Sequence, residues 1–339
     1  GGKRLFCRYI CPVGGFIGLY SMVAPVELRV KDPDVCAKHG EKECIRGSES
    51  GYGCPWLVYP GTLVRNTYCG LCTECLKTCT MDNIAVNVRP FGADLFVNKG
   101  RGLDESFKAF IMLACAAIYS AVFLGPWGFL KDWANISSIP EFLLYAVLFL
   151  GTNLVLIPGS YYLAVWAAKT MAEGRAPARH EALAMLDPLR AILNRLARRP
   201  VATNARRAQT SSVGKLPTLP QLFVDYAYAL VPMGLAAWIA FSISFMLVNI
   251  SYAIPLLSDP FGWGWNLLGT ATYPWTPYFP ELVPYIQVPI LLVGLALSIV
   301  TAYRIARPYA SDKTVAIRSV APVSVFLLGI TMVFFLLYM

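Results

Sequence analysis

The chain of 339 residues is 56% hydrophobic and only 14% charged, and it carries a net charge of +9. These values exclude an ordinary pair of soluble domains. The basic residues lie between apolar runs rather than along one polar face, which excludes nucleic-acid binding as their main role. We therefore expect an α-helical membrane protein. The sequence opens at Gly1 with neither a Met nor a signal-peptide pattern, so we also expect further residues before it.

The N-terminal part, residues 1–104, is predicted to be an iron-sulfur domain because nine of the ten cysteines precede residue 80. CxxC spacings followed by a long apolar region favour metal ligands over a disulfide framework. The run from Cys69 to Cys79 has the C-x2-C-x2-C-x3-C spacing of bacterial ferredoxins, in which the fourth cysteine binds the other of two clusters. Thr80 replaces the proline that usually follows. Zinc is the weaker alternative, since it favours separated CxxC pairs or added histidines.

The ferredoxin spacing predicts two 4Fe-4S clusters that exchange their last ligands. Cys54, which Pro55 follows, fits the last position of a partner motif whose cysteine returns to the first cluster. For the first cluster we assign as ligands Cys69, Cys72, Cys75 and Cys54. For the second cluster we assign as ligands Cys36, Cys44, Cys79 and Cys11.

The fourth ligand of the second cluster has alternatives, because the partner motif is stretched and carries His39 where a cysteine would stand. His39 could bind iron, since imidazole replaces thiolate in some clusters. Otherwise Cys11 or Cys7, which lie one helical turn apart in the segment CRYICP, completes the cluster. We favour a cysteine because thiolate is the commoner ligand. Cys115 lies in an apolar run and is interpreted as a small buried residue.

Residues 105–339 are predicted to form a transmembrane domain, because five apolar runs are long enough to span a bilayer. The expected spans are residues 109–130, 142–168, 221–250, 285–303 and 319–338. The loop of residues 169–215 has ten Lys or Arg and an amphipathic stretch over residues 183–199, so we expect a cytoplasmic loop with an interfacial helix. Each span changes the side of the membrane, and two expected spans separate this loop from residues 1–108. We therefore expect residues 1–108 to be cytoplasmic as well. Neither histidine, His39 or His180, lies in a span, so we expect no haem in this chain.

The segment CRYICPVGGF, followed by CGLCTECLKTC and apolar helices, resembles the NapH/NosR-type membrane polyferredoxins, a group that includes quinol dehydrogenase subunits. The specific part of the resemblance covers residues 7–88. It implies two 4Fe-4S clusters on the cytoplasmic side of a bacterial or archaeal cytoplasmic membrane. It also implies electron exchange with quinone or quinol and with other redox subunits of a membrane complex.

We therefore expect an electron-transfer protein, a subunit of a respiratory oxidoreductase rather than a self-contained enzyme, without catalytic side chains of its own. Basic residues near the cysteines would favour a reduced cluster and dock an acidic partner; they are Lys38, Lys42, Arg46, Arg65 and Lys77. Asp225 is interpreted as an interfacial residue, with a quinone or proton contact as the alternative. The rival functions are an iron-sulfur maturation factor for a respiratory metalloenzyme and a redox-sensing membrane regulator.

Overall fold

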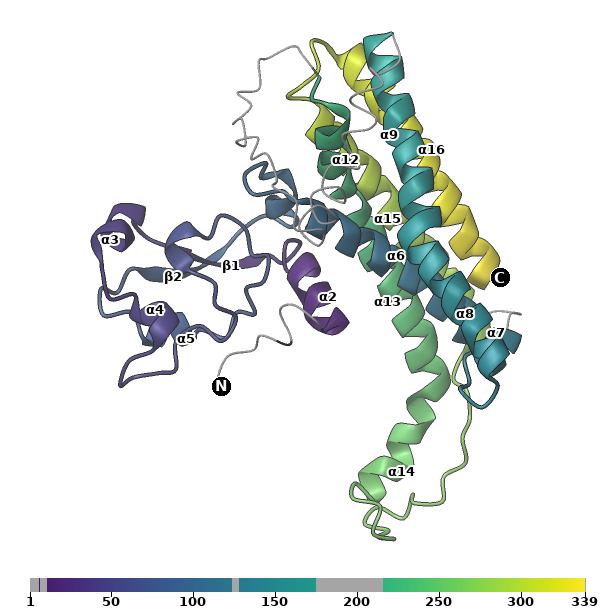
Figure 1. The fold of residues 1–339 in the computed structure, drawn as a ribbon. Helices are drawn as coiled ribbons and strands as arrows, with labels where there is room; N and C mark the ends of the chain where they lie inside the picture. The colour runs from purple at the N-terminus through teal and green to yellow at the C-terminus, as the bar shows by residue number, and fades with distance from the viewer. Residues whose placement is uncertain (1–5, 7–10, 124–127, 175–215, 339) are drawn as a thin grey trace. The chain divides into compact units, whose positions relative to one another are not determined.

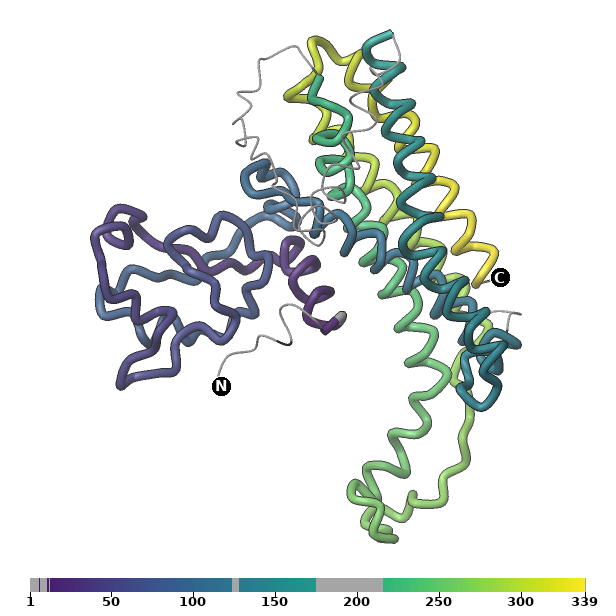
Figure 2. Tube along the Cα trace, in the orientation of Figure 1, coloured from purple at the N-terminus to yellow at the C-terminus, as the bar shows by residue number. Residues whose placement is uncertain are grey.

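The computed structural model describes residues 6, 11–123, 128–174 and 216–338, and the chain divides into two compact units. The first unit comprises residues 1–109 and 220–231, and the second comprises residues 110–219 and 232–339. Figures 1 and 2 follow the chain through both units by colour. The interfacial helix predicted over residues 183–199 lies outside the described residues.

The first unit is built around a two-stranded antiparallel sheet. β1 (Val26–Val30) and β2 (Ile84–Val88) pair from Val26 opposite Val88 to Val30 opposite Ile84. The short helices and 3-10 turns of this unit are α2 (Pro12–Tyr20), α3 (Pro33–Lys38), α4 (Glu43–Arg46), η1 (Pro60–Thr62), α5 (Glu74–Lys77) and η2 (Ala93–Phe96). Alternation along the strands places Leu28 and Ile84 on one face, where they form a small core with Cys75. The cysteine-bearing loops pack against this face.

Buried ion pairs connect segments of the first unit that are far apart in the sequence. Arg65 pairs with Glu105 at 2.7 Å, and both side chains are 6% exposed. Arg101 pairs with Asp225 at 2.9 Å, with exposures of 1% and 0%. Tyr228 accepts a hydrogen bond from Arg65 and is also hydrogen-bonded to Glu105. Arg65 is therefore part of the interior and does not belong to a docking surface, and Asp225 is held in an ion pair.

The remaining elements are mostly long helices. They are α6 (Leu103–Phe123), α7 (Phe129–Trp133), α8 (Ile139–Gly151), the π-helix η3 (Thr152–Leu156), α9 (Ile157–Glu173), α12 (Leu219–Ala227), α13 (Leu230–Asn249), η5 (Ile250–Tyr252), α14 (Ala253–Ser258), η6 (Pro280–Leu282), α15 (Val283–Ala306) and α16 (Lys313–Tyr338). Five of the described helical segments are long and apolar enough to cross a membrane: Leu103–Phe123, Ile139–Glu173, Leu219–Ser258, Pro280–Ala306 and Lys313–Tyr338. The prediction of five spans is confirmed. In the second unit α16 packs against both α9 and α15.

The first span begins earlier than the sequence predicts. The apolar run predicts residues 109–130, whereas α6 covers Leu103–Phe123 and carries Asp104 and Glu105 in its first turn. A charged residue normally argues against a buried helical position, but Glu105 is neutralised by its ion pair with Arg65. The helix therefore starts inside the first unit and continues into the second.

The second span contains a widened turn. α8, η3 and α9 follow one another without a break, and η3 is a π-helix that ends at Leu156, two residues before Pro158. Proline lacks a backbone N–H and its ring clashes with the carbonyl four residues earlier, so a π turn relieves the conflict without ending the helix. Asn153 in this turn donates to the Phe149 carbonyl at 2.7 Å and accepts from the Cys115 thiol at 3.7 Å. Cys115 is buried, as predicted.

Candidate functional site

Two neighbouring pockets of the first unit gather most of its cysteines. The four-cysteine pocket is lined by Cys54, Cys69, Cys72 and Cys75. The three-cysteine pocket is lined by Cys36, Cys44, Cys79 and His39. Pro60 lines both pockets, which places them side by side. Cys11 lines neither pocket, and Cys7 lies outside the described residues.

Each pocket combines one cysteine segment with the last cysteine of the other. Cys54 ends the upstream segment but lies with Cys69 and its neighbours. Cys79 ends the downstream segment but lies with Cys36 and Cys44. The structure thus groups seven cysteines in the crossed arrangement that the spacing predicts. Their role as iron ligands stays a prediction.

The two segments also have the same local backbone. Cys44 and Cys75 are each the second residue of a one-turn helix, α4 and α5. The residue before each helix, Lys42 or Thr73, adopts a left-handed conformation with φ of 52° or 59°. Such angles are uncommon outside glycine and recur at ligand-binding loops, where the surrounding structure enforces them. The chain therefore makes the same turn twice, once beside each pocket.

Packing inside the four-cysteine pocket explains one glycine. A Cβ atom on Gly70 would lie 2.6 Å from Nε1 of Trp56, which itself lines the pocket. The loop that carries Cys69 and Cys72 can approach the indole only because residue 70 has no side chain. Leu71 follows at a positive φ of 48°, so this loop is tightly wound.

Hydrogen bonds to sulfur were not foreseen from the sequence. The Val58 amide donates to Sγ of Cys54, and the Asn83 amide donates to Sγ of Cys79, both at 3.4 Å. The donor lies four residues after the last cysteine of each segment, a repeat that the sequence alone could have suggested. The Asn83 side chain also donates from Nδ2 to Sγ of Cys36 at 3.2 Å. Hydrogen bonds to cluster sulfurs are one of the means by which proteins set reduction potentials.

The thiols in the two pockets resist deprotonation, because they are partly buried and because neighbouring thiolate anions repel one another. Burial raises the pKa of the Cys75 thiol to about 12, and the charges of Cys69 and Cys54 add to the effect. Burial likewise raises the pKa of the Cys44 thiol to about 11, with further contributions from neighbouring cysteines. Several thiolates can coexist in such a pocket only when a cationic centre compensates their charge. The donor set therefore fits a metal centre that binds several thiolates.

Zinc sites and iron-sulfur clusters arrange their thiolate ligands differently. Four thiolates around one zinc, with Zn–S bonds of about 2.3 Å in a tetrahedron, lie about 3.8 Å apart. Within the described part of the chain, only His39, Glu41 and Glu43 form a group of three whose ligand atoms all lie within 4.8 Å of one another. No three described cysteine sulfurs are gathered for a single ion. In a 4Fe-4S cluster, by contrast, each thiolate binds a different iron.

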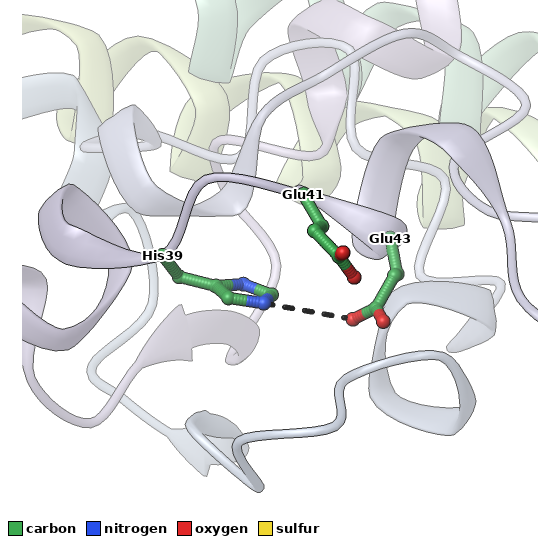
Figure 3. A group of neighbouring side chains, drawn as sticks. All are labelled: His39, Glu41 and Glu43. Atoms are coloured by element: carbon green, nitrogen blue, oxygen red, sulfur yellow. Dashed lines mark ion pairs between the residues drawn. The ribbon is translucent and has the colours of Figure 1, made fainter.

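Figure 3 shows the group formed by His39, Glu41 and Glu43. Nε2 of His39 lies 3.8 Å from a carboxylate oxygen of Glu43. The same oxygen accepts a hydrogen bond of 2.7 Å from the Thr80 hydroxyl. Glu41 is exposed to solvent. His39 thus lines the three-cysteine pocket and lies next to the carboxylates of Glu41 and Glu43.

The second unit contains an apolar groove of about 420 Å³ between α15 and α16. Its lining residues are Ile299, Val300, Tyr303, Arg304, Ile317, Val320, Ala321 and Ser324. The polar side chains are a phenol, a guanidinium and a hydroxyl in an otherwise aliphatic surface. A long apolar molecule with a polar head group has the chemistry to fill such a groove.

Comparison with protein-family models, with curated proteins and with solved structures finds no match for this chain. The five apolar helices establish the coarse class, an α-helical membrane protein. The resemblance to NapH/NosR-type polyferredoxins over residues 7–88 stays a prediction from the sequence.

Proposed function

We propose that the chain is a membrane-bound electron-transfer protein whose first unit is ferredoxin-like and holds two 4Fe-4S clusters. In this proposal the clusters relay electrons between quinone or quinol and a redox partner, within a respiratory complex. The chain serves as an electron-transfer subunit of an oxidoreductase and has no catalytic side chain of its own.

The observation that carries the proposal is the crossed grouping of the cysteines in two adjacent pockets. A structural zinc site needs no exchange of last ligands between two segments, whereas two-cluster ferredoxins are built by that exchange. The N–H donors to the sulfurs of Cys36, Cys54 and Cys79 fit the same kind of centre. When bound, a 4Fe-4S cluster accepts and releases one electron at a time.

Surface charge near the three-cysteine pocket suggests where a partner binds. Lys38, Lys42 and Arg46 are exposed around α3 and α4. Lys77 is different, because it pairs with Glu74 at 3.0 Å. The three exposed cations would attract an acidic protein and speed its association at low ionic strength.

The groove between α15 and α16 is the site we propose for a quinone. Its aliphatic walls suit an isoprenoid tail, and Tyr303 and Arg304 can donate hydrogen bonds to quinone oxygens. The positive-inside rule, applied to residues 169–215 and to the basic connection after Arg304, favours a cytoplasmic location for residues 1–108.

The deciding experiment measures iron and acid-labile sulfide in the anaerobically purified chain and records EPR spectra after reduction. We expect about eight iron and eight sulfide per chain and the signals of two interacting clusters. A chain that contains zinc and no acid-labile sulfide would refute the proposal. A redox titration with a quinol analogue then tests the relay, since rapid reduction is expected. If the chain instead reacts only with a respiratory metalloenzyme that lacks its metal, a maturation factor is the favoured function.

A further inference from the structure

The proposed second cluster still needs a fourth ligand. The three-cysteine pocket contains Cys36, Cys44 and Cys79 but no fourth thiol among the described residues. His39 lines that pocket, and Cys11 does not. The repeat between the two cysteine segments identifies which position is missing.

The repeat is visible in order, spacing and backbone. Cys69 and Cys72 are separated by two residues, as are Cys36 and His39. Each pair precedes a one-turn helix whose second residue is a cysteine of the same pocket, α5 or α4. Each pocket is completed by the last cysteine of the other segment. By this correspondence His39 stands where Cys72 stands in the four-cysteine pocket.

The backbone fixes His39 beside the pocket. It is the C-cap residue of α3, directly after Lys38, and its amide donates to the Val35 carbonyl at 3.1 Å. Cys36 lies within α3, so this hydrogen bond ties His39 to the end of the helix that carries Cys36. The imidazole is partly buried, with 25% of its side chain exposed.

A carboxylate lies beside the His39 imidazole. Metal-ligating histidines usually direct their second ring nitrogen to a carboxylate, which fixes the ring and raises its basicity. Here Nε2 faces Glu43 at 3.8 Å, as Figure 3 shows, and Thr80 holds that carboxylate in place. The remaining nitrogen, Nδ1, is then the atom that can bind iron.

Cys11 belongs to a different part of the first unit. It is the N-cap of α2, and that helix packs on the segment before Cys69: Ser21 donates to the Asn66 carbonyl at 3.0 Å. α2 precedes β1 and α3 follows it, so the two helices adjoin opposite ends of this strand, as Figure 1 shows. Cys11 therefore belongs to the α2 segment and lines neither cysteine pocket.

We propose that His39 is the fourth ligand of the second cluster, through Nδ1, together with Cys36, Cys44 and Cys79. This inference rests on the proposed function, because it requires a 4Fe-4S cluster in the three-cysteine pocket. A neutral imidazole in place of a thiolate makes the cluster less negative and raises its reduction potential. The second cluster is then the electron acceptor of the pair.

The test uses the full chain in detergent micelles, loaded anaerobically, with the variants His39→Cys, His39→Ala and Cys11→Ser. Pulsed EPR of the reduced protein measures hyperfine coupling to a ligand nitrogen. We expect strong nitrogen coupling in the natural chain and in Cys11→Ser, and its loss in His39→Cys with both clusters retained and a lower potential for one. His39→Ala should lose up to half of the iron.

The outcomes separate the two proposals. Two clusters without nitrogen coupling, or loss of the second cluster in Cys11→Ser alone, would overturn the histidine ligand and leave the electron-transfer function standing. Absence of acid-labile sulfide in the natural chain would overturn both. Binding of one divalent ion that depends on His39, Glu41 and Glu43, without sulfide, would likewise overturn both.

Discussion

Asn83 donates a hydrogen bond from its side-chain Nδ2 to Sγ of Cys36 at 3.2 Å. Its backbone amide donates to Sγ of Cys79 at 3.4 Å, so one residue contacts two sulfurs of the three-cysteine pocket. The side chain also bridges to the backbone of Asp32 through both its oxygen and its nitrogen. Asn83 therefore links Asp32, the N-cap residue of α3, to the sulfurs of Cys36 and Cys79.

The first prediction concerns the Asn83→Ala variant. Loss of the Nδ2 donor removes stabilisation of the reduced, more negative cluster, while the backbone donor to Cys79 remains. One hydrogen bond contributes about 0.5–1.5 kcal/mol, so the potential of the second cluster should fall by about 20–60 mV. An EPR-monitored redox titration measures it. Asn87→Ala, at an exposed position of β2, is the matched control and should leave both potentials unchanged.

The second prediction concerns thiol reactivity before metal loading. Only the thiolate is alkylated, and a pKa of about 12 at Cys75 leaves few thiolates at pH 8. Iodoacetamide should therefore modify Cys72, which is exposed, well before Cys75, which is buried. The rate at Cys75 should rise about tenfold per pH unit between pH 8 and 11. Peptide mass spectrometry measures both sites.

Metal loading supplies the control for this experiment. Bound iron protects every ligand thiol, so the loaded chain should lose reactivity at Cys72 and Cys75 together. Equal alkylation of the two residues at pH 8 in the unloaded chain would contradict the pKa that the burial of Cys75 implies.

Sequence patterns predicted the features that depend on residues close together in the chain. Five spans follow from uninterrupted apolar runs, and the grouping of Cys54 with Cys69 follows from motif spacing. The start of α6 did not follow, because Glu105 enters the helix only with Arg65 as its partner, forty positions away in the chain. The sulfur donor Asn83 was missed for the same reason, since a hydrogen bond to Cys36 depends on how β1 and β2 pair.

The third prediction concerns the buried pair of Arg101 and Asp225. Asp225→Leu leaves the guanidinium of Arg101 buried without its charge partner, which should lower the free energy of unfolding by about 3–5 kcal/mol. Adding Arg101→Met should recover most of the loss, because no unpaired charge remains. Denaturant unfolding in detergent micelles, followed by tryptophan fluorescence, measures both variants.

An exposed ion pair gives the comparison. Lys31 and Asp82 lie 2.8 Å apart with side-chain exposures of 50% and 90%, so Lys31→Met should change stability by only about 0–1 kcal/mol. If Asp225→Leu were no more destabilising than Lys31→Met, the pair in the interior would not be contributing as the structure indicates.

The last prediction concerns the groove between α15 and α16. Arg304→Gln removes a cationic donor, and a hydrogen bond from a charged group contributes about 1.5–3 kcal/mol, so the KM for a quinol analogue should rise about tenfold to a hundredfold. Tyr303→Phe removes only a neutral donor and should act more weakly. Stopped-flow measurements of cluster reduction at increasing quinol concentration give the KM of each variant. The iron content of both variants should equal that of the natural chain.

Arg307→Gln is the matched control, because Arg307 lies one turn beyond Arg304 but does not line the groove and donates to the Ala310 carbonyl instead. A general effect of positive charge on anionic lipid would slow Arg304→Gln and Arg307→Gln alike. Binding of the quinone head group in the groove predicts a defect at Arg304 only. Equal defects in the two variants would therefore remove the groove as the quinone site while leaving the two clusters in place.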